Sequence, residues 1–360
     1  MSELSKTTSE SVSRRQFLRG GIAAGAIAGG SLVFGESVAS QALAATTGPK
    51  RKIIWVTHSI GEWNLAVDTG FMDFCEQAGW TYQKLGVPGA AYSAEENVNQ
   101  IKLAIQAKPD VIVGTITDPA VEAPLLDAEK AGILVLLNNS SNEEIRAAHD
   151  WGFIGAGGYG QGLIVGRKLG PLLIDKGKKS GVIGFGNAEP GHAVLRDRKE
   201  GTIAGLKEVS EKQGAKFTFE EFADQSHDVA ASIPIYTTFV RSKGDNLAAI
   251  VGSGYSSMVA SWRALQDAKA SPGSIPIGGF DTGPDINEGI EKGYIVLSVE
   301  QELYNQGYLP SAIAWTRLER LNIPPIVNTG TAVVTKDNLK FFADRTNIML
   351  ERAKELGIRH

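Results

Sequence analysis

A glycine-rich run, Gly155-Ala156-Gly157-Gly158-Tyr159-Gly160, has the G-x-G-x-x-G spacing that cradles the pyrophosphate of dinucleotides. It follows apolar residues 151–154 and precedes a predicted helix, and Asp175 lies 20 residues after Gly155, where such a site needs an acid for the ribose. Asp175 sits in a Lys-rich turn, however, whereas that acid should end the following strand. Two interpretations stay open. The run could form the nicotinamide site of an exported oxidoreductase, or it could lie at a hinge where backbone segments approach so closely that only small residues fit.

Other residue types that commonly do chemistry are sparse and poorly spaced. The five histidines show neither H-x-x-x-H nor H-E-x-x-H spacing and are His58, His149, His192, His227 and His360. There is no G-x-S-x-G nucleophile elbow. Cys75 is the single cysteine, so neither a disulfide nor a Cys-based zinc site can form within one chain. We therefore predict no catalytic group, no metal and no cofactor, and expect a binding protein rather than an enzyme.

The N-terminal segment has the order of an export signal. Arg14-Arg15 lies four residues before an uncharged, Gly- and Ala-rich run from Gly20 to Gly35, which is too short and too weakly apolar to span a membrane. Ala42-Leu43-Ala44 offers the small residues of a cleavage site. This resembles a twin-arginine (Tat) signal, and the alternative is a disordered basic arm. We expect residues 1–44 to be removed and the remaining chain to reach the periplasm.

Composition limits the possible partners. The 360 residues carry 36 Lys and Arg against 40 Asp and Glu, a formal net charge of −4. No basic patch favours nucleic acid, and no second apolar run favours membrane insertion. A chain of this length is longer than one hydrophobic core usually accommodates, which favours two domains. We expect the protein to be a monomer.

From residue 52 onward, short β-branched runs alternate with amphipathic stretches. Helices are predicted near 64–78, 94–106, 120–131, 158–176, 196–213, 229–243 and 256–270, with strands near 53–56, 81–85, 111–113, 133–137, 151–154, 181–184, 216–222, 248–251 and 275–280. Apolar strands that alternate with helices indicate α/β halves, each with a parallel sheet covered on both faces. The pattern restarts near residue 154, which predicts two doubly wound lobes.

In such a fold the loops after the strands gather along one edge of each sheet, where ligands bind. The segments that follow predicted strands are 57–64, 114–119, 138–142, 186–196, 252–257, 281–284 and 300–304. If the lobes face each other, both sets of loops line one site.

Four stretches, in order, carry a resemblance to a known family. They are Pro109 to Val113 with Ala131-Gly132-Ile133, the R-x-R-x-x-G run Arg196 to Gly201, the G-F-D-x-x-P-D run Gly279 to Asp285, and Val299-Glu300-Gln301 with Asn305 to Tyr308. Over residues 51–348 the chain is similar to the type I, ribose-type periplasmic binding proteins.

The resemblance implies two lobes joined by a hinge that the chain crosses three times. Lobe one would hold residues 50–154 plus 303–327, and lobe two residues 155–301 plus 328–348. It implies capture of a sugar or polyol between the lobes, hinge closure, and delivery to the membrane permease of an ABC importer.

The resemblance also implies ligand contacts for Arg196, Asp281 and Gln301. Planar polar groups can hydrogen-bond two neighbouring hydroxyls at once, and the arginine fork suits vicinal hydroxyls better than lysine would. Each has an alternative role: Arg196 could be a surface residue at the start of a helix, and Asp281 could cap a helix or stabilise a turn. Gln301 could simply end a strand.

In the first loop, Trp63 aligns with an aromatic that covers the sugar face, with Asn64 beside it; the alternative is a core tryptophan. Asn139-Ser140 replaces the Asp-Arg pair usual in the family, so we expect a ligand other than ribose. Three weaker candidates in the second lobe are Tyr255, His227 and Asp228.

Overall fold

The computed structural model describes residues 49–61, 63–87, 93–224, 228–319, 321 and 326–358. The predicted export signal and His227 lie outside these residues. Among the residues described, no helix combines the length and the apolar character needed to cross a membrane.

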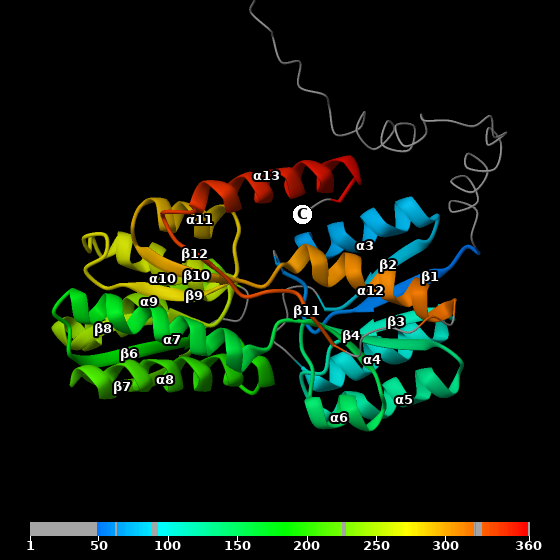
Figure 1. The fold of residues 1–360 in the computed structure, drawn as a ribbon, viewed down its shortest axis with the longest axis horizontal. Coiled ribbons are helices and arrows are strands. Elements are labelled where there is room, and N and C mark those ends of the chain that lie inside the picture. The colour runs from blue at the N-terminus through cyan, green and yellow to red at the C-terminus, as the bar shows by residue number, and fades with distance from the viewer. Residues whose placement is uncertain are drawn as a thin grey trace, which may run out of the picture. The chain divides into compact units, whose positions relative to one another are not determined.

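The described residues build two six-stranded sheets (Figure 1). The first has the order β11-β5-β4-β3-β1-β2, from β1 (Lys52–Val56), β2 (Thr81–Leu85), β3 (Val111–Gly114), β4 (Leu134–Asn138), β5 (Gly152–Gly155) and β11 (Ile326–Asn328). The second has the order β12-β10-β9-β8-β6-β7, from β6 (Ser180–Asn187), β7 (Lys216–Ala223), β8 (Leu247–Gly252), β9 (Ile277–Phe280), β10 (Ile295–Glu300) and β12 (Ala332–Val334).

Among the strands described, all pairs are parallel except β10 and β12, which pair antiparallel. The prediction of parallel sheets thus holds for all but one edge. The chain enters β12 directly from β11 in the other sheet, without a helical crossover of the kind that a parallel neighbour requires.

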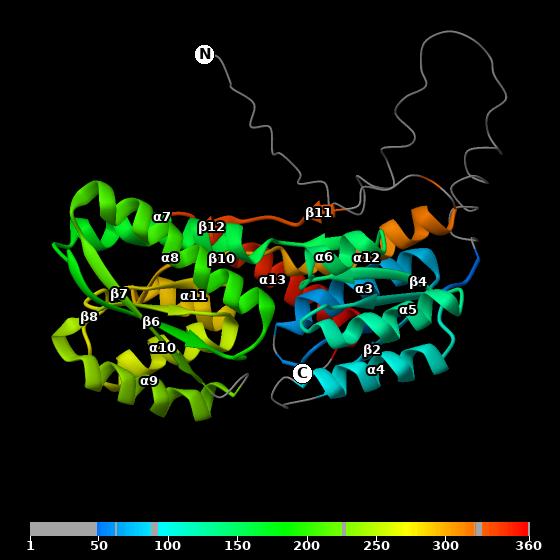
Figure 2. The same cartoon turned by 90° about the horizontal axis from the view of Figure 1, so that it is seen from below.

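Helices cover both faces of each sheet (Figures 1 and 2). The first sheet carries α3 (Asn64–Ala78), α4 (Ala94–Gln106), the turn η1 (Pro119–Val121), α5 (Glu122–Lys130), α6 (Glu143–Ala148) and α12 (Leu303–Leu318). The second carries α7 (Gly158–Asp175), α8 (Ala193–Gln213), α9 (Val229–Lys243), the turn η2 (Gly244–Asn246), α10 (Tyr255–Asp267) and α11 (Pro284–Glu291). The last helix, α13 (Leu339–Glu355), contacts both α3 and α11.

Each sheet has hydrophobic cores on both of its faces, because side chains alternate between the two faces along each buried strand. Ile53 and Trp55 of β1 pack with residues of α3 and α12, whereas Ile54 and Val56 pack with residues of α4 and α5. Successive side chains of a strand point to opposite faces, so an uninterrupted apolar strand must be covered twice. The structure therefore confirms the predicted class of two doubly wound α/β lobes.

The glycine-rich run serves helix packing. A Cβ on Gly158 would lie 2.8 Å from the Val194 carbonyl oxygen, and one on Gly162 would lie 2.2 Å from the Arg198 carbonyl oxygen. Glycine at these positions lets α7 approach the backbone of α8 closely. Of these two glycines only Gly158 belongs to the run, so helix packing explains Gly158 but not Gly157 or Gly160, where a Cβ would meet no atom within 4 Å. Nothing in the described residues favours the oxidoreductase.

Candidate ligand-binding site

Asp281 lies directly after β9 and is held from three sides. It is 5% exposed and adopts a φ of 75°, a region that Asp tolerates better than most residues. Its Oδ2 accepts a hydrogen bond from the Tyr255 backbone N–H at 2.8 Å, and its Oδ1 accepts one from Gln301 Nε2. Its carbonyl oxygen accepts one from Ser298 Oγ at 2.5 Å. The carboxylate therefore has a fixed position at the carboxyl edge of the second sheet.

Arg198 of α8 approaches the same carboxylate. Its Nη2 lies 3.9 Å from Asp281 Oδ1, its Nη1 donates to the Ser253 carbonyl at 2.8 Å, and its Nε donates to Gln161 Oε1 at 3.1 Å. The guanidinium also lies over the Phe280 ring, 4.5 Å from its centroid. Burial lowers the pKa of Arg198, and the Asp281 carboxylate opposes that shift. A buried cation held in this way is ready to donate to an anionic or hydroxylated ligand.

Arg196, the predicted ligand arginine, lies elsewhere. Its side chain is 59% exposed and its Nη2 lies 3.5 Å from Asp197 Oδ1. Residues two apart on a helix point to different sides, so only one arginine of the R-x-R pair can face the sheet edge. The structure brings Arg198 to Asp281 and leaves Arg196 at the surface. Arg198 is not among the predicted site residues, although the same motif contains it.

Gln301 and Asn139 are joined through Gln306, which is not among the predicted site residues. Gln306, in the first turn of α12, donates from Nε2 to the Gln301 carbonyl at 3.1 Å. It accepts at Oε1 from Asn139 Nδ2 at 3.0 Å. Thr329 Oγ1, just after β11, also donates to the Gln301 carbonyl at 2.7 Å. This buried network links the end of β4 with the end of β10, close to where the chain passes between the sheets.

Trp63 and Asn64 belong to the loop after β1. Trp63 is half-buried, packs edge-on against Trp55 at 5.8 Å between ring centroids, and stacks on His58 at 5.2 Å. Asn64 is buried; its Oδ1 accepts from Gly61 N at 2.6 Å and its Nδ2 donates to Thr57 Oγ1 at 3.3 Å. In this arrangement Asn64 braces the loop, and Trp63 combines core packing with partial exposure.

The remaining candidates differ in their surroundings. The Tyr255 hydroxyl donates to Asp285 Oδ2 at 3.2 Å, while its backbone holds Asp281. Asp228 is exposed and caps α9 by accepting from Ala231 N at 2.9 Å. The structure thus brings Tyr255 to the Asp281 group and places Asp228 at a helix end.

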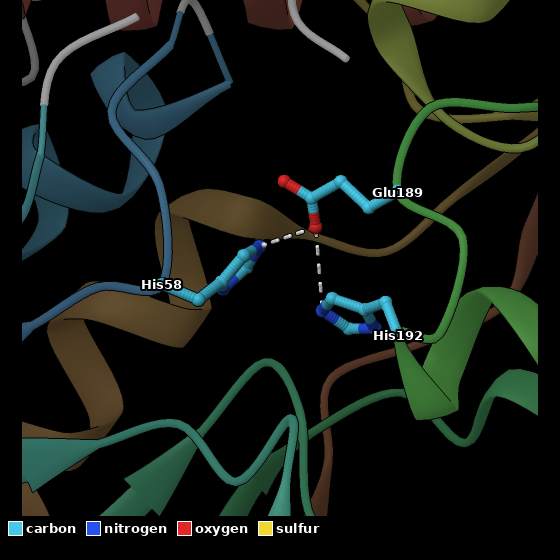
Figure 3. A group of neighbouring side chains, drawn as sticks. All are labelled: His58, Glu189 and His192. Atoms are coloured by element: carbon cyan, nitrogen blue, oxygen red, sulfur yellow. Dashed lines mark ion pairs between the residues drawn. The ribbon is translucent and has the colours of Figure 1, made fainter. Parts of the chain in front are cut away.

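A second polar group joins loops from the two sheets (Figure 3). His58 Nε2 lies 3.7 Å from Glu189 Oε2, and His192 Nε2 lies 3.8 Å from the same oxygen. His58 follows β1, whereas Glu189 and His192 follow β6. None of the three is among the predicted site residues. They lie in two of the predicted edge segments, but a pair so distant in sequence has no spacing signal.

Comparison with known proteins places this geometry in context. Residues 52–320 match the model of a family described as periplasmic binding protein domain. A curated relative, the xylose/arabinose-binding protein XylF of Sulfolobus acidocaldarius, is 23% identical over 315 residues, which cover 81% of this chain and 73% of that protein.

Solved structures share the fold. An ABC transporter solute-binding protein of Burkholderia graminis in complex with D-arabinose has a TM-score of 0.70 at 23% identity, covering 80% of this chain and 96% of that chain. A carbohydrate transporter of Acidothermus cellulolyticus in complex with myo-inositol has a TM-score of 0.71 at 18% identity, covering 84% and 99%.

Proposed function

Because this chain belongs to the periplasmic binding protein domain family, we propose that it captures a sugar or polyol and delivers it to an ABC importer permease. The observation that carries the proposal is the buried group of Asp281, Gln301 and Arg198 at the carboxyl edge of the second sheet. The names of similar proteins, which mention arabinose, xylose and myo-inositol, support the choice of ligand class.

The chemistry of this group suits neighbouring hydroxyls. A hydroxyl both donates and accepts, the Asp281 carboxylate only accepts, and the Arg198 guanidinium only donates. Their 3.9 Å separation is too long for a direct hydrogen bond. Two adjacent hydroxyls of one ligand can therefore bond to both groups. Asn139 and Gln301 offer amides, and the exposed part of Trp63 offers a surface for an apolar sugar face.

Hinge closure is the proposed mechanism of capture. The Gln306 network links the two sheet edges, so it is one element through which a ligand on one side can influence the other. A ligand shifts an open–closed equilibrium only by its differential affinity for the two forms, which here means contacts made to both lobes at once. The lobe boundaries given above, 50–154 plus 303–327 and 155–301 plus 328–348, are part of this proposal.

We further propose Tat-dependent export to the periplasm, removal of residues 1–44, and action as a monomer that returns its ligand chemically unchanged. The twin arginines and the residues resembling a cleavage site support the export route.

A thermal-shift screen tests the function. Pentoses, hexoses, alditols and deoxy-sugars are compared with nicotinamide nucleotides, and a ligand at 100 times its dissociation constant adds about 2.7 kcal/mol to the free energy of unfolding. We expect a shift with at least one sugar or polyol. If a nicotinamide nucleotide raised the melting temperature and no sugar or polyol did, the oxidoreductase interpretation would be favoured instead. Mass analysis after long incubation with the best ligand checks that no product forms.

A further inference from the structure

The two histidines and the glutamate between the sheets form a compact ligand set. Their three ligand atoms lie within 4.8 Å of one another, with both histidine Nε2 atoms directed at one glutamate oxygen (Figure 3). The side chains of His58, Glu189 and His192 are 7%, 2% and 3% exposed. Within the part of the chain that the structure describes, this is the one group of three His, Cys, Asp or Glu residues whose ligand atoms come so close.

We propose that His58, Glu189 and His192 bind a transition-metal ion, and that Zn²⁺ fits the set best. Two imidazoles with one carboxylate are a common zinc ligand set, with bonds of about 2.0–2.2 Å and tetrahedral geometry. Atoms bonded to one such ion lie about 3.3–3.5 Å apart by that geometry. The observed 3.7 and 3.8 Å between each histidine and Glu189, and the separations of up to 4.8 Å within the set, must therefore shorten by side-chain rotation when the ion binds. The fourth position is open to water or to a further ligand.

The surroundings position His58 before any ion arrives, whereas His192 must give up its bond from Val194 N–H to coordinate through Nε2. The His58 ring is stacked on Trp63, and the loop that carries it is held by Asn64 through Thr57 and Gly61. His192 is the N-cap of α8, where its Nδ1 accepts from Val194 N at 3.2 Å. Coordination through His192 Nε2 places the ring proton on Nδ1, so this capping bond is exchanged for the metal bond.

The low exposure of Glu189 strengthens its attraction for a cation. Electrostatic interactions are screened less in a buried site than in water, so the Coulomb attraction between Oε2 and a divalent ion is stronger there, and the three protein ligands replace part of the hydration that the ion loses. Imidazole ligands favour zinc, nickel and copper over Mg²⁺ and Ca²⁺, which prefer oxygen. The site should therefore discriminate strongly against Mg²⁺.

The three proposed metal ligands come from loops of both sheets, so a bound ion would connect the two sheets. His58 comes from the loop after β1 in the first sheet, and the other two come from the loop and helix start after β6 in the second. A bound ion would bond both loops at once. It would favour the arrangement in which they meet, independently of the ligand held at Asp281.

Titration of the chelator-treated, untagged chain with Zn²⁺, without sugar, tests the proposal. We expect one ion per chain by calorimetry, and visible absorption typical of tetrahedral Co²⁺ when Co²⁺ replaces zinc. His58→Gln and Glu189→Gln should each weaken Zn²⁺ binding at least tenfold. Mg²⁺ should not compete.

The chain offers a matched control in His149, whose Nε2 lies 2.7 Å from Glu122 Oε1 and which has no place in the cluster. His149→Gln should bind Zn²⁺ like the parent. The proposal would be overturned if the parent did not bind one Zn²⁺ per chain, or if His58→Gln bound Zn²⁺ as tightly as the parent. It would also be overturned if His149→Gln lost as much Zn²⁺ affinity as His58→Gln. Because His192→Gln also removes a helix cap, His58→Gln is the deciding variant, with its melting temperature measured beside it. The titration contains no sugar, so its failure would leave the proposed function unaffected.

Discussion

Arg198 Nη2 lies 3.9 Å from Asp281 Oδ1, and both side chains are almost completely buried at the carboxyl edge of the second sheet. Each is held by other partners: Arg198 by Ser253 and Gln161, and Asp281 by Tyr255 and Gln301. The cation and the anion are therefore fixed near each other without sharing a short hydrogen bond. This is the arrangement that a polyhydroxylated ligand can bridge.

The two arginines of the R-x-R motif provide a direct comparison. Arg198→Ala should weaken binding of the screened sugar by roughly ten- to a hundredfold, since hydrogen bonds to charged groups contribute about 1.5–3 kcal/mol. It should also lower the free energy of unfolding, because Asp281 loses a buried cation. Arg196→Ala, which removes an exposed side chain, should bind like the parent. Calorimetric affinity and ligand-free melting are measured for both, and a loss of affinity confined to Arg196→Ala would reverse our assignment.

Glu300 predicts a pH dependence of stability. Burial, followed by the nearby Asp281 and Glu302 carboxylates, raises the pKa of Glu300 to about 7. The folded state then holds a proton that the unfolded state releases above its lower pKa near 4.5. The stabilisation is fully present below about pH 4.5 and is lost as the pH rises to about 7, on the order of 3 kcal/mol in total.

Glu300→Gln should remove this decline, because an amide does not titrate. Denaturant unfolding of both proteins at several pH values measures it, with the exposed Glu129→Gln as a control that should keep the parent slope. Equal pH slopes for Glu300→Gln and the parent would show that Glu300 is not the group responsible.

Gly158 and Gly160 separate the two interpretations of the glycine-rich run. Gly158→Ala should destabilise the protein by about 1–3 kcal/mol, because the new Cβ would lie 2.8 Å from the Val194 carbonyl oxygen. A Cβ on Gly160 meets no atom within 4 Å, so Gly160→Ala should be neutral or stabilise α7 by up to about 1 kcal/mol. Denaturant unfolding measures both changes. Two equally mild effects would contradict the packing explanation.

Trp63→Ala tests whether this side chain is part of the core or part of the site. A fully buried tryptophan would cost about 3–5 kcal/mol of stability on truncation, and the half-buried Trp63 should cost less. We expect a larger effect on sugar affinity than on ligand-free melting. A large loss of melting temperature with unchanged affinity would return Trp63 to the core that includes Trp55 and Phe71.

Export can be tested apart from binding. Replacing Arg14 and Arg15 together with Lys should leave precursor in the cytoplasm, because the twin-arginine pathway reads that pair. Cell fractionation measures the distribution. Normal export of the double variant would refute the Tat route while leaving the ligand site untested and unchanged.

Much of the fold follows from local sequence pattern. The helices predicted at 64–78, 94–106 and 229–243 match α3, α4 and α9 to the residue. The helix predicted from 196 begins at Ala193, where His192 supplies the cap. The short strands β11 and β12 and the terminal helix α13 were beyond prediction, since what stabilises them is their partner in another part of the chain.

The two α/β lobes, the segments that gather at the sheet edges and the place of Asp281 after a buried strand can all be predicted from the amino-acid sequence. The folded chain is needed to show which arginine of the motif faces Asp281, that Gln306 joins Asn139 to Gln301, and that His58 meets Glu189 and His192. Apolar periodicity is local and can be read along the chain. Side-chain direction on a helix and contacts between distant loops depend on how the elements pack, and that information is absent from any single stretch of sequence.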